Sequence, residues 1–172
     1  MELKEAAYPA FFTATNLEWK NLLQPEKYKK IIVDSFQFLK QHKRVNIYGF
    51  VIMDNHLHLI WQMLNGVKRE NVERDFLKFT AQQIKKDLHE NHPLVLEQFR
   101  VNAKDREYQF WERKPLSIIL RNDKIFKQKL EYIHNNPVKA GLCIEPEEYK
   151  YSSAKFYTTG VDEWGFIKHY QD

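Results

Sequence analysis

The sequence contains little cysteine, proline or glycine, the residues that cross-link a polypeptide, kink it or make it flexible. It contains one cysteine, Cys143, which excludes an internal disulfide and a multi-cysteine zinc site. Only 5 glycines and 6 prolines occur among 172 residues, of which 43% are hydrophobic and 15% are aromatic. That composition excludes disordered and collagen-like chains. The length favours one domain, so we expect residues 1–172 to fold as a single unit with a sizeable core.

Long hydrophobic runs are also missing. The longest apolar-aromatic stretch lies around residues 50–53 and is far shorter than the ~18 residues of a membrane-spanning helix. Residues 1–5 lack the basic start and the apolar core of a signal peptide. We therefore expect a cytoplasmic protein that has no membrane partner.

Although the formal net charge is only +4, positive charge is concentrated in one segment. Residues 100–130 contain nine basic and four acidic side chains, and three aromatic residues lie among them at 108–111. Basic residues beside aromatic ones suit a polyanion whose bases can stack, so Arg113, Lys114 and Lys129 are candidate nucleic-acid contacts. The alternative is a solvated helical face next to ordinary core aromatics.

Hydrophobic periodicity and turn residues predict a mixed α+β fold. Apolar residues recur with the spacing of helices or of strands, and Asp54 and Asn55 supply the turn of a hairpin. The predicted elements are a strand at 8–15, a helix at 25–42, strands at 45–53 and 56–63, a helix at 71–89 capped by Asn71, a strand at 107–111, and a helix at 123–136 that ends at Pro137. The order βαββαβα indicates a ferredoxin-like antiparallel sheet with two helices on one face and an added C-terminal helix.

Two histidines, His56 and His58, lie on the second strand of the predicted hairpin. Side chains two residues apart on a strand point to one face, with Cα atoms about 6.5–7 Å apart, so both imidazoles can reach one metal ion. A two-residue turn places His58 opposite Val51, with Gly49 nearby and space for a ligand, while the odd-numbered residues 57–63 face the core. The alternative is a pair of half-buried histidines that are satisfied by hydrogen bonds.

A second group of polar residues lies on the last predicted helix. Tyr132 and Asn136 are four residues apart and share a face, so a phenol oxygen and an amide oxygen can address one site. Lys129 lies one turn earlier on the same face and could contact phosphate. Pro137 disfavours helical backbone at Asn136, which puts this geometry at the very end of the helix. The alternative is a partly exposed tyrosine and a helix-terminal asparagine.

Several sequence blocks resemble a known family in their order and spacing. They are YGFVIMDNHLHLIW from Tyr48, FWER from Phe110 and EYIHNNPVKAGL from Glu131, followed by YSSA from Tyr151. Over about residues 8–157 the chain resembles the REP-associated tyrosine transposases, a group of single-tyrosine HUH transposases.

The resemblance implies a function and the residues that perform it. His56 and His58 match a histidine pair that binds a divalent metal, usually Mg²⁺ or Mn²⁺, and Asn136 matches the position of a third ligand. Tyr132 matches the nucleophile. Such enzymes cleave single-stranded DNA next to hairpins and leave a 5′-phosphotyrosine and a free 3′-hydroxyl that can later rejoin strands. We therefore expect a DNA nickase and strand transferase whose partner is single-stranded or hairpin DNA; a homodimer is an open alternative.

Two other functions stay open from the sequence. A nucleic-acid-binding module could keep the fold without cutting, and a metal-dependent phosphohydrolase would use water and form no covalent adduct. The chain also departs from the family at Asp54, where the group commonly has proline. Because this position is in a turn, we expect Asp54 to alter loop stiffness or to add an outer hydrogen-bond acceptor.

The remaining histidines and a serine pair are given no catalytic role. The histidines at 42, 89, 92, 134 and 169 are expected at the surface or at helix ends. Ser152 and Ser153 have no recognisable triad partners in the sequence.

Overall fold

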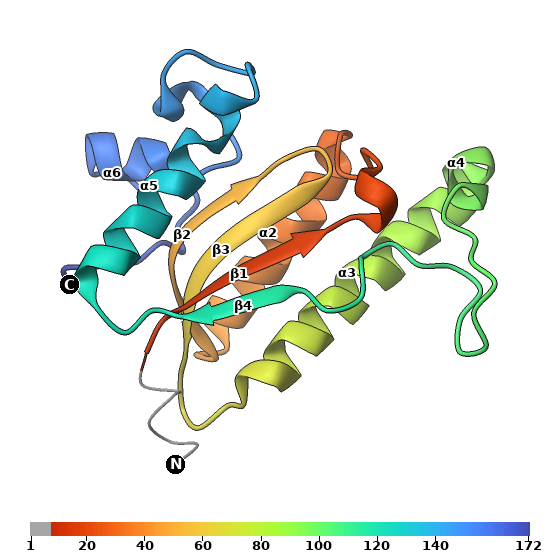
Figure 1. Cartoon of the computed structure of the whole chain (residues 1–172), viewed down its shortest axis with the longest axis horizontal. Helices are drawn as coiled ribbons and strands as arrows, with labels where there is room; N and C mark the ends of the chain where they lie inside the picture. The colour runs from red at the N-terminus through yellow and green to blue at the C-terminus, as the bar shows by residue number, and fades with distance from the viewer. Residues whose placement is uncertain (1–7) are drawn as a thin grey trace.

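The computed structural model describes residues 8–172, which form a four-stranded antiparallel sheet with helices on both faces (Figure 1). The strands are β1 (Ala10–Thr15), β2 (Val45–Ile52), β3 (His56–Met63) and β4 (Leu116–Ile119), in the spatial order β2-β3-β1-β4. The helices are α2 (Glu26–Gln41), α3 (Arg69–Asn91), α4 (Pro93–Glu97), α5 (Asp123–Lys139) and α6 (Ala154–Thr159), with 3₁₀ turns at Leu17–Trp19 and Pro146–Glu148. This topology confirms the predicted ferredoxin-like α+β fold with an added C-terminal helix. Within residues 8–172, no helix is long and apolar enough to cross a membrane.

Helices α2 and α3 cover one face of the sheet and enclose the main hydrophobic core. The odd-numbered residues 57–63 of β3, which were predicted to face the core, are buried there. Ile32 and Phe36 of α2 are four residues apart and enter the same core, where the ring of Phe76 from α3 stacks on Phe36 with 5.6 Å between centroids. The strand period of two and the helical period of 3.6 thus bury their apolar residues in one layer.

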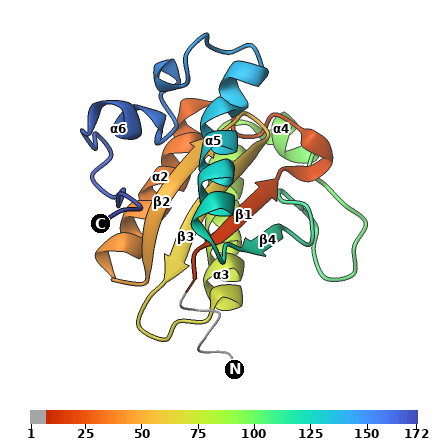
Figure 2. The same ribbon diagram turned by 60° about the vertical axis from the view of Figure 1, so that its left-hand side comes forward.

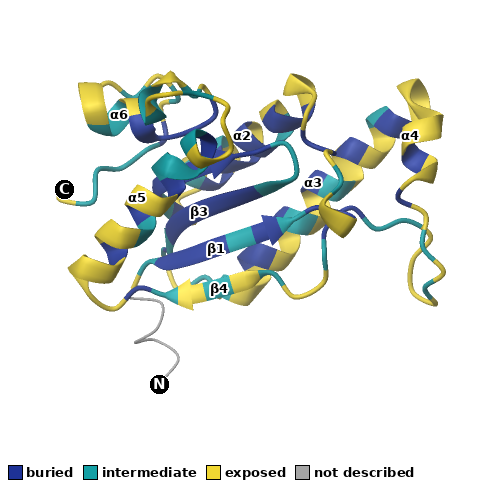
Figure 3. Ribbon diagram, turned by 45° about the horizontal axis from the view of Figure 1, so that its top comes forward, coloured by how far each residue is buried: buried dark blue, intermediate teal, exposed yellow. Residues whose placement is uncertain are grey.

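Helix α5 covers only part of the opposite face. Its residues Phe126 and Leu130 pack over β2 and β3 in a second, smaller core with Val51 and Ile60. Gly49 permits this approach, because a Cβ atom there would lie 2.5 Å from Cδ1 of Leu130. The predicted register of the hairpin is correct, because His58 lies opposite Val51 and Ile60 lies opposite Gly49. Leu130, however, fills the space that was expected at Gly49 for a ligand. Helix α5 leaves β4 and much of β1 uncovered (Figure 2), and β4 is the exposed strand of the sheet (Figure 3).

The segment after α5 covers the outer edge of β2. The amide of Ile52 donates to the carbonyl of Tyr151 at 2.9 Å, and the amide of Ser153 donates to the carbonyl of Phe50 at 3.0 Å. Unpaired strand edges attract other strands, so this pairing protects the sheet. The YSSA block from Tyr151 therefore has a structural role.

The fourth strand lies at Leu116–Ile119 and not at 107–111, as the sequence predicted. Residues 107–111 make only isolated bridges to other segments. Phe110 and Trp111 are buried in the main core, and Nε1 of Trp111 donates a hydrogen bond to Oγ1 of Thr80 on α3 at 3.2 Å. The strand-like composition of this segment thus reflects burial against a helix, which favours the same residue types as sheet pairing.

Helix α3 begins earlier than the sequence predicted. It starts at Arg69, with Lys68 in the N-cap position, two residues before the expected cap at Asn71. The amide of Asn71 donates to the carbonyl of Lys68 at 3.1 Å, so Asn71 belongs to the first turn. The predicted capping role of Asn71 is therefore wrong.

Helix α5 continues through Pro137 to Lys139, although the sequence predicted an end at Asn136. Proline removes one amide donor from the helix but is itself buried here. The next turn still closes, because the amide of Ala140 donates to the carbonyl of Asn136 at 3.0 Å. Asn136 consequently keeps helical geometry and its place one turn after Tyr132.

Candidate active site

The β2–β3 hairpin places His56 and His58 side by side. The amide of Met53 donates to the carbonyl of His56 at 2.8 Å across the two-residue turn, and His58 lies opposite Val51. Both imidazoles therefore point to the face that carries α5, and their ring centroids are 4.9 Å apart at an interplanar angle of 75°. This is the convergence that the spacing of the two histidines predicted.

The Nδ1 atom of each histidine lies within hydrogen-bond distance of a side-chain oxygen. Nδ1 of His56 lies 2.7 Å from Oδ1 of Asn55, which can only accept, so this nitrogen donates and Nε2 carries the lone pair. Nδ1 of His58 lies 2.7 Å from Oγ1 of Thr13 on β1. Ligand histidines in metal sites are commonly oriented by such contacts on the other ring nitrogen. Thr13 and Asn55 thus hold the orientation of two imidazoles whose rings lie side by side.

Burial keeps both imidazoles uncharged at neutral pH. Burial lowers the pKa of His58 to about 3, and the positive charge that His56 gains on protonation and that of Lys129 act in the same direction. Burial also lowers the pKa of His56, while a hydrogen bond with Asn136 opposes this shift. Only neutral imidazole binds metal ions, so burial keeps both histidines in the protonation state that a metal ligand requires.

Helix α5 brings the tyrosine and the amide to the histidines. The ring of Tyr132 packs edge-on against His58 with 5.3 Å between centroids and keeps 45% of its surface exposed. Nζ of Lys129 lies 4.8 Å from the centroid of Phe11 and 5.8 Å from that of Tyr132. Together with the hydrogen bond between Asn136 and His56, these contacts join five predicted site residues in one place.

The donor set fits a divalent metal ion. Two imidazole nitrogens and one amide oxygen are available from His56, His58 and Asn136, and imidazole nitrogen suits transition-metal ions. In the part of the chain that the structure describes, no group of three or more His, Cys, Asp and Glu side chains could hold a metal. The amide of Asn136, which hydrogen-bonds to His56, lies where the family resemblance implies a third ligand.

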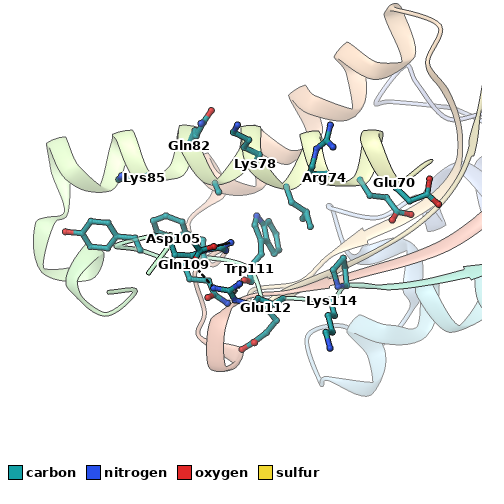
Figure 4. A pocket seen from close by; sticks show the side chains of 18 residues that line it. Glu70, Arg74, Lys78, Gln82, Lys85, Asp105, Gln109, Trp111, Glu112 and Lys114 are labelled. Atoms are coloured by element: carbon teal, nitrogen blue, oxygen red, sulfur yellow. Dashed lines mark hydrogen bonds and ion pairs between the residues drawn. The ribbon is translucent and has the colours of Figure 1, made fainter. Parts of the chain in front are cut away.

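The other two candidate nucleic-acid contacts lie elsewhere. Arg113 and Lys114 line a cavity of about 740 Å³ between α3 and residues 105–115, where Trp111 points toward the helix (Figure 4). The guanidinium of Arg113 lies 3.1 Å from the carboxylate of Asp105, which neutralises part of its charge. The basic segment therefore does not form one surface: Lys129 lies at the histidines, and these two residues lie beside α3.

Asp54, which departs from the family pattern, ties the hairpin turn to α2. Its carboxylate accepts a hydrogen bond from Nζ of Lys29 at 2.7 Å, and the side chain of Lys29 is only 6% exposed. The same ammonium group donates to the carbonyls of Leu23 and Gln24. Asp54 thus partners a buried cation just before the turn residue Asn55, which orients His56.

The sequence interpretation missed that His134 of α5 contacts the segment along the edge of β2. Its Nε2 atom lies 2.7 Å from Oγ of Ser153, which also accepts from the amide of Phe50 at 3.0 Å. Burial lowers the pKa of His134 to about 4. The expected surface position is therefore wrong for this histidine: it joins α5 to the edge of β2. Ser153 is fully buried, so the pair has no access to a substrate.

Trp19 is another neighbour of the site that the sequence did not indicate. Its ring lies edge-on to His56 with 5.6 Å between centroids and is 60% exposed. The residue has a left-handed backbone conformation, with φ of 57°, in the turn that follows β1. No spacing rule connects residue 19 with residue 56, so only the folded chain reveals this contact.

Comparisons with known proteins point in one direction. No family model matches the chain. A curated Haemophilus influenzae protein, described as a candidate REP-associated tyrosine transposase, is 25% identical over 174 aligned residues that cover 92% of each chain. A solved REP-associated tyrosine transposase bound to a REP hairpin superposes with a TM-score of 0.66 at 18% identity and covers 96% of this chain and 88% of its own. The chain is thus similar along nearly its whole length to REP-associated tyrosine transposases, which confirms the resemblance carried by its sequence motifs.

Proposed function

We propose that this protein is a transposase-like enzyme that cleaves and rejoins single-stranded DNA beside hairpins, with Tyr132 as nucleophile and a divalent metal as cofactor. The observation that carries the proposal is the position of Tyr132, whose exposed ring lies against His58 and one turn from Asn136. The similarity to transposases, one of them bound to a hairpin, supports DNA as the substrate.

The reaction exchanges one phosphodiester for another. The phenol oxygen of Tyr132 attacks the phosphorus, the bond between phosphorus and the 3′ oxygen breaks, and a 5′-phosphotyrosine forms. The phenol loses its proton and the departing 3′ oxygen gains one. Attack by a 3′-hydroxyl on the phosphotyrosine then restores a DNA strand and frees the tyrosine. Because the ester bond is conserved, strand transfer needs no nucleotide hydrolysis.

The residues around the tyrosine have separate roles. A divalent ion such as Mn²⁺ or Mg²⁺, held by His56, His58 and Asn136, would neutralise charge on the scissile phosphate. Thr13 and Asn55 keep the imidazoles oriented. Lys129, close to the rings of Phe11 and Tyr132, supplies a positive charge beside the place where phosphate would lie.

A covalent adduct separates this function from its two alternatives. The wild-type protein is incubated with Mn²⁺ and a DNA hairpin that carries a labelled single-stranded tail, and the products are separated under denaturing conditions. We expect a protein adduct on the 5′ phosphate of the downstream fragment and an extendable 3′-hydroxyl on the upstream one. Tyr132→Phe keeps the ring but removes the attacking oxygen, so cleavage and adduct should both disappear.

The other outcomes identify the competing functions. Cleavage without an adduct would indicate a hydrolase that uses water. Binding without cleavage would indicate a DNA-binding module. An adduct that persists in Tyr132→Phe would place the nucleophile elsewhere; Tyr149, whose hydroxyl donates to the carbonyl of Ile52 at 2.6 Å, serves as a comparison tyrosine that is engaged in the fold.

A further inference from the structure

Two apolar side chains of β4 lie exposed beside the candidate active site. Leu116 is 51% exposed and Ile118 is 36% exposed, in a strand at the edge of the sheet. Figure 3 shows exposed β4 beside the largely buried β1, with β3 on the other side of β1. Isolated exposed apolar side chains are common on proteins, whereas ones that lie together beside a functional site are candidates for contact with a ligand.

The strand register places these side chains on the face that carries the histidines. Leu116 lies opposite Thr13, and Ile118 lies opposite Phe11. Directly opposed residues of antiparallel strands project to the same face. Thr13 contacts Nδ1 of His58, and the ring of Phe11 stacks on His58 with 5.4 Å between centroids. Leu116 and Ile118 therefore share one face of the sheet with His58.

Helix α5 borders this face on its other side. Ile125, Lys129, Tyr132 and Asn136 follow one another at spacings of four, three and four residues, which places them along one side of the helix. The contact of Lys129 with the ring of Phe11 shows that this side faces β1. The uncovered face thus has a cation and a phenol along α5 and apolar side chains along β4.

This arrangement matches the chemistry of an unpaired nucleotide, which combines an anionic phosphate with a flat apolar base. Neighbouring strands are about 4.8 Å apart, so β4 lies roughly 10 Å from β3 across the sheet. A phosphate at Tyr132 and Lys129 would therefore leave an adjacent base within reach of Leu116 and Ile118. Proteins bind the bases of single strands largely through contacts with the faces of the bases, most often from aromatic rings, and such contacts tolerate many sequences. Leu116 and Ile118 offer aliphatic surface to the same faces.

We propose that Leu116 and Ile118 form a base-binding platform for the unpaired nucleotides next to the scissile phosphate. This inference rests on the proposed function, because it takes Tyr132 as the point of cleavage. The platform binds bases of the single-stranded tail and makes no contact with the paired stem of the hairpin. It is therefore a determinant of affinity for the tail.

Binding measurements without metal test the platform separately from catalysis. The affinities of the full-length protein are measured by fluorescence anisotropy in EDTA for three probes: a hairpin with a single-stranded tail, the same hairpin with a blunt end, and a tailed hairpin whose tail carries abasic sites. Leu116→Ser and Ile118→Ser should each weaken binding of the tailed hairpin by roughly five- to tenfold, through lost apolar contact. Neither variant should change binding of the other two probes.

Matched substitutions control for the change from an apolar to a polar residue. Leu94 on α4 is 83% exposed and Ile144 is 82% exposed, and neither belongs to the sheet. Leu94→Ser and Ile144→Ser should bind all three probes as the wild type does. Circular dichroism and thermal unfolding show whether each variant is folded before its affinity is compared.

Three results would overturn the platform. Equal losses for tailed and abasic probes would mean that the residues act through phosphate or through the fold. Unchanged affinity in both variants would mean that bases bind elsewhere. A change from dimer to monomer in Leu116→Ser, measured by analytical ultracentrifugation, would mean that a second copy of the chain covers β4.

Failure of the platform and failure of the proposed function give different results. If the wild-type protein forms the adduct at Tyr132 while both β4 variants bind the tailed probe normally, only the platform is refuted. If the wild type forms no adduct but prefers the tailed probe through Leu116 and Ile118, the platform stands and the catalytic proposal fails.

Discussion

The hydroxyl of Thr13 on β1 lies 2.7 Å from Nδ1 of His58 on β3, so a neighbouring strand holds this imidazole in place. Thr13→Val keeps the shape of the side chain but removes its oxygen. Since such contacts orient metal ligands, we expect Mn²⁺ affinity to fall about tenfold or more, measured by calorimetry. Thr13→Ser should restore most of the affinity. Thr158→Val, which removes a hydroxyl on α6, is the matched control. Equal affinities in wild type and Thr13→Val would contradict the orienting role.

The two histidines should be required for metal binding. His56→Ala and His58→Gln each remove one imidazole, so calorimetric titration with Mn²⁺ should show little or no binding. His89→Ala changes an exposed histidine of α3 and should bind Mn²⁺ normally. If the pair instead serves only the core, the variants will unfold at lower temperature while Mn²⁺ binding, measured on the folded protein, stays at the wild-type level.

Lys114 is expected to contact DNA phosphate from the rim of the cavity beside α3. Lys114→Gln should weaken DNA binding for all sequences and reduce the slope of log affinity against log salt concentration by about 1. Arg113→Gln should have a smaller effect, because Asp105 already neutralises part of its charge. Lys30→Gln on α2 removes an exposed lysine from the far layer and serves as the control. Parallel salt plots for Lys114→Gln and wild type would leave this residue as an ordinary solvated side chain.

His134 should make the protein less stable in mild acid. Its folded pKa of about 4 lies below the ordinary value, so the unfolded chain binds a proton that the folded chain excludes. The stability that neutral His134 contributes is complete above pH ~6.5 and falls as the pH drops toward 4. His134→Gln removes this titration. The difference in unfolding free energy between wild type and variant should therefore shrink by about 2 kcal/mol between pH ~7.5 and ~5, measured with urea.

Tyr132→Phe is the control variant for the pH experiment. This variant keeps His134 and its contact with Ser153, so its stability should follow the wild-type pH dependence. A difference between wild type and His134→Gln that does not change with pH would show that His134 titrates normally in the folded protein.

Local spacing was sufficient for part of the site. The alternation of residues 56–63 and the two-residue turn predicted that His56 and His58 share a face, and the helical interval predicted the same for Tyr132 and Asn136. These relationships hold because the periods of strands and helices are properties of the backbone and do not depend on what packs against them. The order of elements likewise predicted the ferredoxin-like sheet.

Composition misled the prediction where burial and sheet pairing favour the same residues. Phe110 and Trp111 suggested a strand but pack against α3, while the real fourth strand exposes Leu116 and Ile118. The predicted end of α5 at Asn136 failed for a related reason: a buried Pro137 is tolerated when the surrounding helix is held by tertiary packing.

Local spacing along the chain was enough to pair His56 with His58 and Tyr132 with Asn136, because each pair lies within one element. Three other relationships come from packing in the folded chain: α5 lies over β3, Leu130 fills the space above Gly49, and Thr13 orients His58. These contacts join residues about 45 to 80 positions apart in the chain, and no backbone period links them. They depend on which side chains fit together when the helices and strands pack, so the chain must fold before the four residues form one site.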